Sequence, residues 1–141
     1  MDKERIYIKL DEIDQYLKEI EEIIPSSSAE YSTDPMRKRA LERLIQITVE
    51  SVMDVSAILV KEMRLGLPYG EEDFLDKISG TVLSPVLVEK LREMKGFRNI
   101  LVHGYSQIDD ERVYEILTSD IEDVIEFKEA VIEFLRRTED D

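Results

Sequence analysis

Apolar residues recur at alternating spacings of four and three along almost the whole chain. In the first segment these positions are Ile6, Leu10, Ile13, Leu17, Ile20 and Ile24. This spacing places apolar side chains on one face of an α-helix, and no segment shows the strict alternation that is typical of a strand. We therefore predict an all-α protein, an antiparallel helical bundle with four to five main helices and one short helix.

Prolines, glycines and capping residues divide this pattern into segments. The predicted helices cover residues 3–24, 35–64, 71–78, a segment that begins at residue 85, and residues 109–137. Two prolines stand at first helical positions, where a missing N–H is tolerated: Pro35 and Pro85. The polar stretch 25–34 is expected to be a loop, and Gly66 suits the C-terminal cap of the second helix. Ser119 and Glu122 have the spacing of a capping box, which indicates a break or kink near Thr118.

The second predicted helix is apolar on more than one face. Its main apolar stripe is extended around the surface by Ile47, Met53, Ile58 and Val60. A helix with this character lies in the centre of a bundle or faces a partner subunit. The length of 141 residues predicts one domain, residues 1–141, built on one core.

The composition excludes several classes of protein. With no cysteine and one histidine, the chain has no disulfide, no thiolate metal site and no histidine-rich zinc site within one subunit, so we expect no metal and no cofactor. No apolar run approaches the roughly 20 residues that span a bilayer, and the charged N-terminus lacks the apolar core of a signal peptide. We therefore expect a cytoplasmic protein. The net charge of −14 is wrong for a protein that holds long nucleic acid by phosphate neutralisation alone.

One segment departs from this acidic character. From Met94 to Ile108 there is no Asp or Glu, and the segment carries Lys95, Arg98 and His103. An anionic ligand would need such a segment in a chain of this charge. His103 is also the only histidine, and hence the one side chain whose unperturbed pKa lies near neutral pH.

Arg98 interrupts the apolar stripe of its helix, which otherwise consists of Leu87, Leu91, Met94 and Leu101. An arginine at such a position must be paired, or must line a cleft or an interface, because an unpaired buried charge is costly. Asn99 and His103 are one turn apart on another face, together with Arg92 and Lys95.

Arg98 and His103 are five residues apart, which is roughly 140° around an ideal helix. They converge if the helix ends near Val102 and the chain turns at Gly104. They also converge across a two-fold axis, where the groups of one subunit meet those of the other. The pattern therefore favours a site at a helix C-terminus or at the contact between two subunits.

These side chains suit metal-free cleavage of RNA. The guanidinium binds phosphate and stabilises negative charge, the imidazole moves a proton, and the Asn99 amide orients an oxygen. Acyl transfer and phosphoryl transfer from ATP are disfavoured, because no nucleophile elbow and no Gly-rich phosphate loop is present. Simpler roles compete: His103 as a helix cap, Arg98 in a structural ion pair, and Tyr105 as a rim aromatic residue.

The segment from Arg98 to Tyr105 resembles the R-x-x-x-x-H-x-Y motif of HepT-type toxins, which belong to the HEPN superfamily of helical ribonucleases. Three further segments resemble the same family: residues 39–62, 67–74 and 108–117. The resemblance thus covers nearly the whole chain.

The resemblance implies an all-α homodimer with its motifs near the dimer cleft. Arg98 and His103 would be the catalytic pair of a metal-independent endoribonuclease, the toxin of a type VII toxin–antitoxin system. Tyr105 would be adenylylated by a cognate minimal nucleotidyltransferase antitoxin, which would repel or occlude RNA. Asn99 fits the Arg-Asn pair that is frequent in the family, and we assign it, with Lys95, to binding of the substrate phosphate.

Two other functions remain open at this point. The chain would be a non-catalytic helical partner of a nucleotidyltransferase, with the region from Arg98 to His103 as a docking or nucleotide-binding surface. Alternatively, it would be a purely structural helical dimer, in which replacing His103 or Tyr105 changes stability only.

Overall fold

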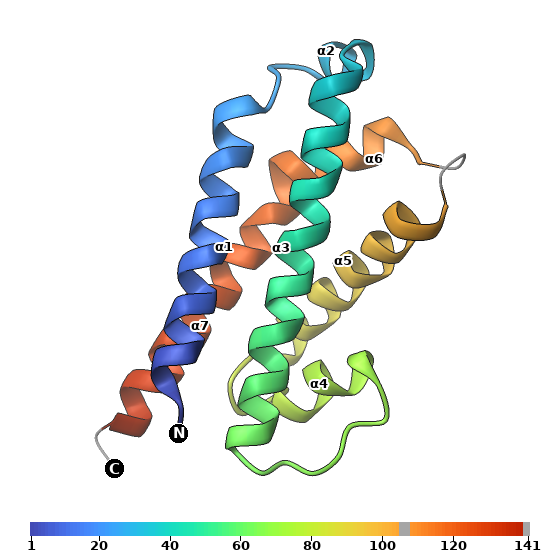
Figure 1. Ribbon diagram of the computed structural model, residues 1–141. Coiled ribbons are helices and arrows are strands. Elements are labelled where there is room, and N and C mark those ends of the chain that lie inside the picture. Colours follow the sequence, from blue (N-terminus) through green and yellow to red (C-terminus); the bar gives the residue numbers. More distant parts are fainter. Residues whose placement is uncertain (105–107, 140–141) are drawn as a thin grey trace.

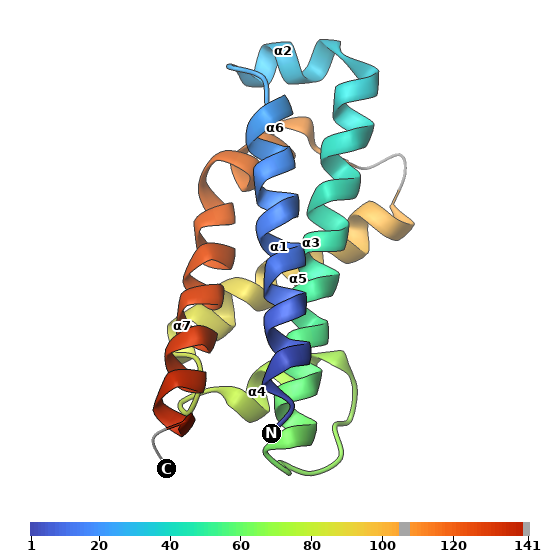
Figure 2. The same cartoon turned by 60° about the vertical axis from the view of Figure 1, so that its left-hand side comes forward.

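The computed structural model describes residues 1–104 and 108–139 (Figure 1). Four long helices run in alternating directions, as Figures 1 and 2 show from two sides: α1 (Lys3–Ile23), α3 (Pro35–Glu62), α5 (Pro85–His103) and α7 (Ile121–Glu139). Three short helices connect them: α2 (Ser28–Thr33), α4 (Glu71–Ile78) and α6 (Asp110–Glu115). The predicted all-α antiparallel bundle is confirmed, although the described residues contain three short helices where one was expected.

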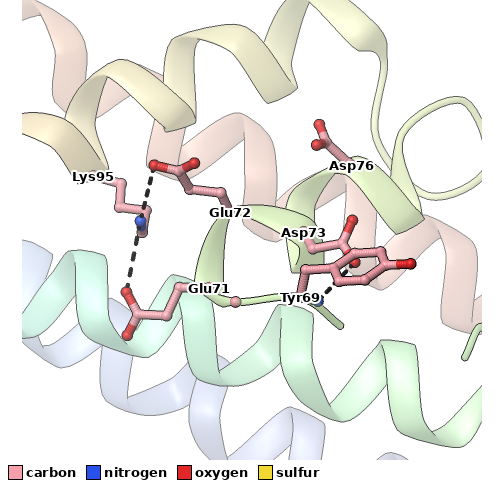
Figure 3. Close-up of a pocket in the computed structure, with 7 residues that line it drawn as sticks. Tyr69, Glu71, Glu72, Asp73, Asp76 and Lys95 are labelled. Atoms are coloured by element: carbon pink, nitrogen blue, oxygen red, sulfur yellow. Dashed lines mark hydrogen bonds and ion pairs between the residues drawn. The ribbon is translucent and has the colours of Figure 1, made fainter. Parts of the chain in front are cut away.

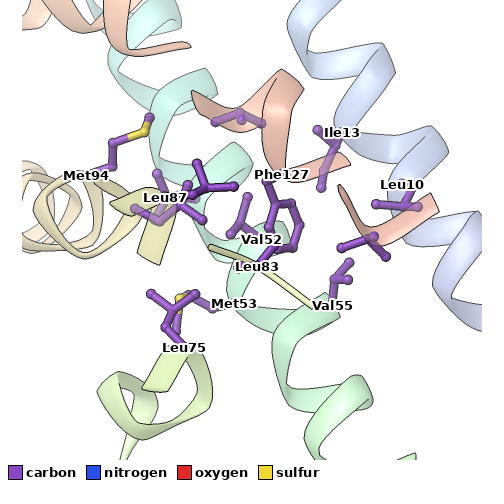
Figure 4. Packing of buried hydrophobic residues seen from close by; sticks show 14 of the residues in the cluster. Leu10, Ile13, Val52, Met53, Val55, Leu75, Leu83, Leu87, Met94 and Phe127 are labelled. Carbon is purple, nitrogen blue, oxygen red and sulfur yellow. The ribbon is translucent and has the colours of Figure 1, made fainter. Parts of the chain in front are cut away.

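Helix α3 occupies the centre of the bundle and packs against α1, α2, α4 and α5. Figure 4 shows its side chains among those of α1, α4, α5 and α7. The labelled residues of this contact region are Leu10 and Ile13 from α1, Val52, Met53 and Val55 from α3, Leu75 from α4, Leu83, Leu87 and Met94 from the α4–α5 connection and α5, and Phe127 from α7. The broad apolar surface of this helix is therefore explained by burial on several sides.

The polar composition of residues 25–34 suggested a loop, but this prediction is wrong, because most of the segment forms α2. Ser27 caps this helix by accepting a hydrogen bond from the Glu30 N–H at 3.1 Å. The Glu30 carboxylate in turn accepts bonds from the Ser26 N–H at 2.9 Å and from its hydroxyl at 2.8 Å. Ser27 and Glu30 have the spacing of a capping box, which is the signal that the composition obscured.

Tyr31 fixes α2 to the rest of the bundle. Its side chain is fully buried, and its ring centroid lies 6.2 Å from that of Tyr114 on α6. The Tyr114 hydroxyl donates to the Pro25 carbonyl oxygen at 2.8 Å, whereas the buried Tyr31 hydroxyl has no hydrogen-bond partner among the described residues. Burial raises the pKa of the Tyr31 phenol above its ordinary value.

The predicted break near Thr118 is confirmed, but a capped helix start does not produce it. Residues Ile116–Asp120 form a π-helical turn, which leads from α6 into α7. The Thr118 hydroxyl donates to the Tyr114 carbonyl oxygen at 2.9 Å, a bond that bends helices. The chain therefore changes helical register here without stopping.

Helix α3, the second of the helices predicted from the sequence, ends earlier than expected. Its last residue is Glu62 and its C-cap is Met63, so the predicted cap at Gly66 is wrong. Arg64, with φ of 54°, already takes the left-handed conformation that was expected of a glycine at this end, and Gly66 follows with φ of 97°. None of the described helices is long and apolar enough to cross a membrane.

We predict that the two contacting tyrosines respond in opposite directions to loss of the hydroxyl. Tyr31→Phe should leave the free energy of unfolding unchanged or raise it, because the lost hydroxyl is buried without a partner. Tyr114→Phe should lower it by about 1 kcal/mol, because a hydrogen bond is lost. Urea unfolding measures both, and a clear loss of stability in Tyr31→Phe would show that its hydroxyl is satisfied in solution.

Candidate functional site

The predicted site residues lie on α5, which begins and ends at well-defined positions. The Ser84 hydroxyl caps its start by accepting from the Leu87 N–H at 3.1 Å, and Pro85 takes the first helical position. At the other end the Gly104 N–H donates to the Ile100 carbonyl oxygen at 2.7 Å. Between these ends the helix buries one apolar face against α3 and α7.

Because α5 continues through His103, the side chains of Arg98 and His103 belong to one continuous helix. Five residues correspond to roughly 140° of rotation, so the two groups leave the helix in different directions. The helix ends at His103, one residue beyond the expected end near Val102, and Gly104 is its C-cap, so the chain leaves the helix only after His103. What remains is convergence between two subunits.

The structure pairs Arg98 with two carboxylates from other helices. The side chain is 10% exposed, and Nη2 of its guanidinium donates to Glu71 Oε2 at 2.6 Å. Its Nη1 lies 3.7 Å from Glu50 Oε1 on α3. The third nitrogen, Nε, is buried and has no hydrogen-bond partner among the described residues. In the single chain, Arg98 is thus a nearly buried and incompletely satisfied cation.

Lys95 shares one of these carboxylates. Its ammonium nitrogen lies 3.8 Å from Glu71 Oε2 and 3.6 Å from Glu72 Oε1, and Figure 3 shows it between the two side chains. Lys95 and Arg98 are three residues apart and reach the same partner, although the periodicity placed them on different faces. The segment from Met94 to Ile108 contains no acidic residue, but in the folded chain the carboxylates of α4 lie beside its cations.

Asn99 and His103, in contrast, are exposed. They are one turn apart on α5, as the sequence indicated. A ligand can reach this pair without any rearrangement of the chain. Tyr105 lies outside the described residues, so its predicted role stays a prediction.

A hollow of about 390 Å³ adjoins the cationic pair at the start of α4. Its lining, shown in Figure 3, consists of Tyr69, Gly70, Glu71, Glu72, Asp73, Asp76 and Lys95. Four carboxylates against one ammonium group make this hollow unfavourable for a phosphate. Within residues 1–104 and 108–139, no group of three or more acidic or histidine side chains is placed to hold a metal ion.

Sequence reasoning missed Glu50 and Glu71 as partners of Arg98. Glu71 is 27 residues away from Arg98 along the chain, and Glu50 lies on another long helix. No local spacing could reveal these contacts, because they depend on how α3, α4 and α5 pack together.

We predict that two glycines of the α5 segment respond differently to alanine. A Cβ at Gly104 would lie 2.9 Å from the Ile100 carbonyl oxygen, whereas a Cβ at Gly96 has no heavy atom within 4 Å. Gly104→Ala should therefore destabilise the protein by about 1 kcal/mol, because the backbone around His103 must shift. Gly96→Ala, the matched control within the helix, should stabilise it by roughly 0.5–1 kcal/mol. Thermal unfolding distinguishes the two, and equal behaviour would show that the end of α5 is not tightly packed.

The helical bundle and the R-x-x-x-x-H segment at the end of α5 together have the architecture that the sequence resemblance implies. The chain belongs to the ribonuclease HepT-like family, whose model matches residues 13–131. The family predicted from the sequence is thereby confirmed.

Individual relatives agree with this placement. A protein of Archaeoglobus fulgidus is 30% identical over 131 residues, which cover 90% of this chain and 92% of the relative. The tRNA nuclease HepT of Aphanizomenon flos-aquae is 26% identical over 77% of this chain and 75% of its own. Among solved structures, the tri-AMPylated HEPN toxin of Shewanella oneidensis, in complex with the MNT antitoxin, superposes with a TM-score of 0.85. That comparison covers 91% of this chain and 96% of the other at 21% identity, so it shows the fold.

Proposed function

We propose that this protein is the endoribonuclease toxin of a type VII toxin–antitoxin system and that Arg98 and His103 carry out the cleavage. The family supports the ribonuclease activity, and a relative is named as a tRNA nuclease. The observation that carries the assignment is the exposure of the only histidine at the end of the motif helix. A general base must be accessible to its substrate, and His103 is.

The reaction needs few groups. The His103 imidazole accepts the proton of a ribose 2′-hydroxyl, whose oxygen attacks the adjacent phosphorus. The P–O5′ bond breaks, the leaving 5′-oxygen takes up a proton from solvent, and a 2′,3′-cyclic phosphate remains. The Arg98 guanidinium stabilises the negative charge that develops on the phosphate oxygens, and Asn99 and Lys95 hold the phosphate. This chemistry is complete without a metal ion, so we propose metal independence, which cleavage in excess chelator would test.

The active form is proposed to be a homodimer with composite sites. Within one chain, Arg98 and His103 leave α5 about 140° apart, which does not suit a shared substrate. A two-fold axis beside α5 brings the arginine of one subunit to the histidine of the other. The protein is proposed to act in the cytoplasm, where its RNA substrate and the ATP used by the antitoxin are both found.

The antitoxin is proposed to be a minimal nucleotidyltransferase that adenylylates Tyr105. The solved toxin of Shewanella oneidensis, which shares the fold, is AMPylated and in complex with an MNT antitoxin. Tyr105 follows the motif histidine by two positions. A nucleotide at this position would add bulk and negative charge beside the imidazole and so exclude RNA.

One observation favours the alternative, a non-catalytic partner of the nucleotidyltransferase. Arg98 and Lys95 are already paired with carboxylates, as in a purely structural network. This alternative predicts stable co-purification with the transferase and no RNA cleavage by the free protein at high concentration.

We predict that Arg98→Ala and His103→Ala each lower the rate of RNA cleavage by about 10²–10⁴-fold, the usual contribution of an acid–base or charge-stabilising group. The measurement uses the purified protein, a labelled RNA and a folded state verified by circular dichroism. Arg92→Ala is the matched control, because Arg92 lies on the same helix but pairs with Glu89 and Asp76. Unchanged toxicity of His103→Ala would contradict the catalytic assignment.

The composite site is tested by co-expressing the two inactive variants. Half of the dimers would be mixed, and each of these would hold one complete site of two, so about a quarter of the wild-type activity should return. No recovery, or a mass near 16.5 kDa by light scattering at micromolar protein, would contradict the shared site.

We predict an AMP adduct on Tyr105 after incubation with ATP and the neighbouring nucleotidyltransferase, detected by mass spectrometry of the digested protein. Tyr105→Phe should lose the adduct. Tyr69→Phe should keep it, although Tyr69 is 99% exposed and is freely accessible. An adduct on Tyr69 in place of Tyr105 would refute the site.

A further inference from the structure

We propose that Glu71 competes with the substrate phosphate for Arg98 and thereby sets the affinity of this protein for RNA. The inference rests on the proposed function, because it takes Arg98 as the group that receives the phosphate. It adds an affinity-determining residue that lies outside the motif helix, at the start of α4.

Access to the Arg98 guanidinium is the first step of the argument. Only 10% of the side chain is exposed, and Nη2 is occupied by Glu71 at 2.6 Å. Glu50 stands 3.7 Å from Nη1, and Nε is buried. A guanidinium commonly binds phosphate through two of its nitrogens. A phosphodiester that binds Arg98 in this way must therefore take the place of at least one carboxylate.

Of the two carboxylates, Glu71 is the one that can leave. Its side chain is 50% exposed, and it lies in the first turn of an eight-residue helix. Glu50, at 38% exposure, lies within the 28-residue central helix α3. The segment before α4 is also open, since Leu67 and Tyr69 are 91% and 99% exposed. A rotation of the Glu71 side chain releases Arg98 without any change in the core.

The exchange is balanced in charge. A phosphodiester carries one negative charge, as the Glu71 carboxylate does, so the substitution leaves the net charge around the guanidinium unchanged. Displacement of Glu71 also removes one of the two partners of Lys95. A single carboxylate therefore restrains both cations that the motif helix offers to RNA.

The experiment measures RNA binding in the absence of cleavage. In a His103→Ala background, binding of a fluorescent single-stranded RNA is followed by anisotropy, with and without Glu71→Gln. We expect Glu71→Gln to tighten the Kd by about tenfold, which is about 1.4 kcal/mol. The slope of log Kd against log salt should also steepen by about 0.7 for each additional phosphate contact.

Asp76→Asn is the matched control. It removes one negative charge from the same helix, but Asp76 pairs with Arg92 and not with Arg98 or Lys95. The Kd of this variant for RNA should therefore stay within about twofold of that of the parent, because a surface charge that does not contact Arg98 or Lys95 is largely screened at physiological salt. Equal tightening by Asp76→Asn would show a general charge effect and would overturn the proposal.

Two further results are decisive. An unchanged or weaker Kd in Glu71→Gln would mean that Glu71 holds Arg98 in place and does not compete, which also overturns the proposal. If Glu71→Gln does not fold, Glu71→Asp retains the charge but withdraws the carboxylate, and an intermediate tightening is expected; no change would overturn the idea. Failure of the proposed function is seen separately, as persistent RNA cleavage in Arg98→Ala.

Discussion

Burial of α3 on several sides is the constraint on which the arrangement of the site depends. Because α4 and α5 both pack against this helix, the start of α4 and the middle of α5 are brought together beside Glu50. Arg98 therefore lies between carboxylates from two other helices, and Lys95 reaches one of them. The charges near the motif follow from the packing of the core, and the motif alone does not determine them.

This arrangement gives a strongly acidic protein a way to handle an anionic substrate. Most of the surface repels RNA, since the chain carries a net charge of −14. The cations of α5 are held in ion pairs, while Asn99 and His103 remain exposed. Under the proposed function, RNA meets the imidazole first and reaches the guanidinium only by exchange. The repulsion by the acidic surface and the competition of Glu71 for Arg98 together lower the affinity of the protein for RNA.

The sequence predicted those parts of the fold that depend on local periodicity. The helix over residues 71–78 and the break near Thr118 are found where they were expected, because apolar spacing and turn residues act over short distances. The helix α2 was missed because its serines suggested a loop and the burial of Tyr31 depends on Tyr114, far along the chain. The pairing of Arg98 was anticipated, but Glu71 and Glu50 could not be identified, since tertiary packing alone brings them together.

The π-helical turn before α7 has a consequence for evolution of the chain. A π-turn accommodates one residue more than an α-helix does over the same path, and each residue of an α-helix turns it by about 100°. Deleting one residue between Ile116 and Asp120 would therefore leave a regular helix over the same path, and the residues of α7 would keep the directions in which they now face. Phe127 and Val131, both fully buried, would stay in the core. The length of this short segment can therefore change by one residue without turning the apolar face of α7 towards solvent.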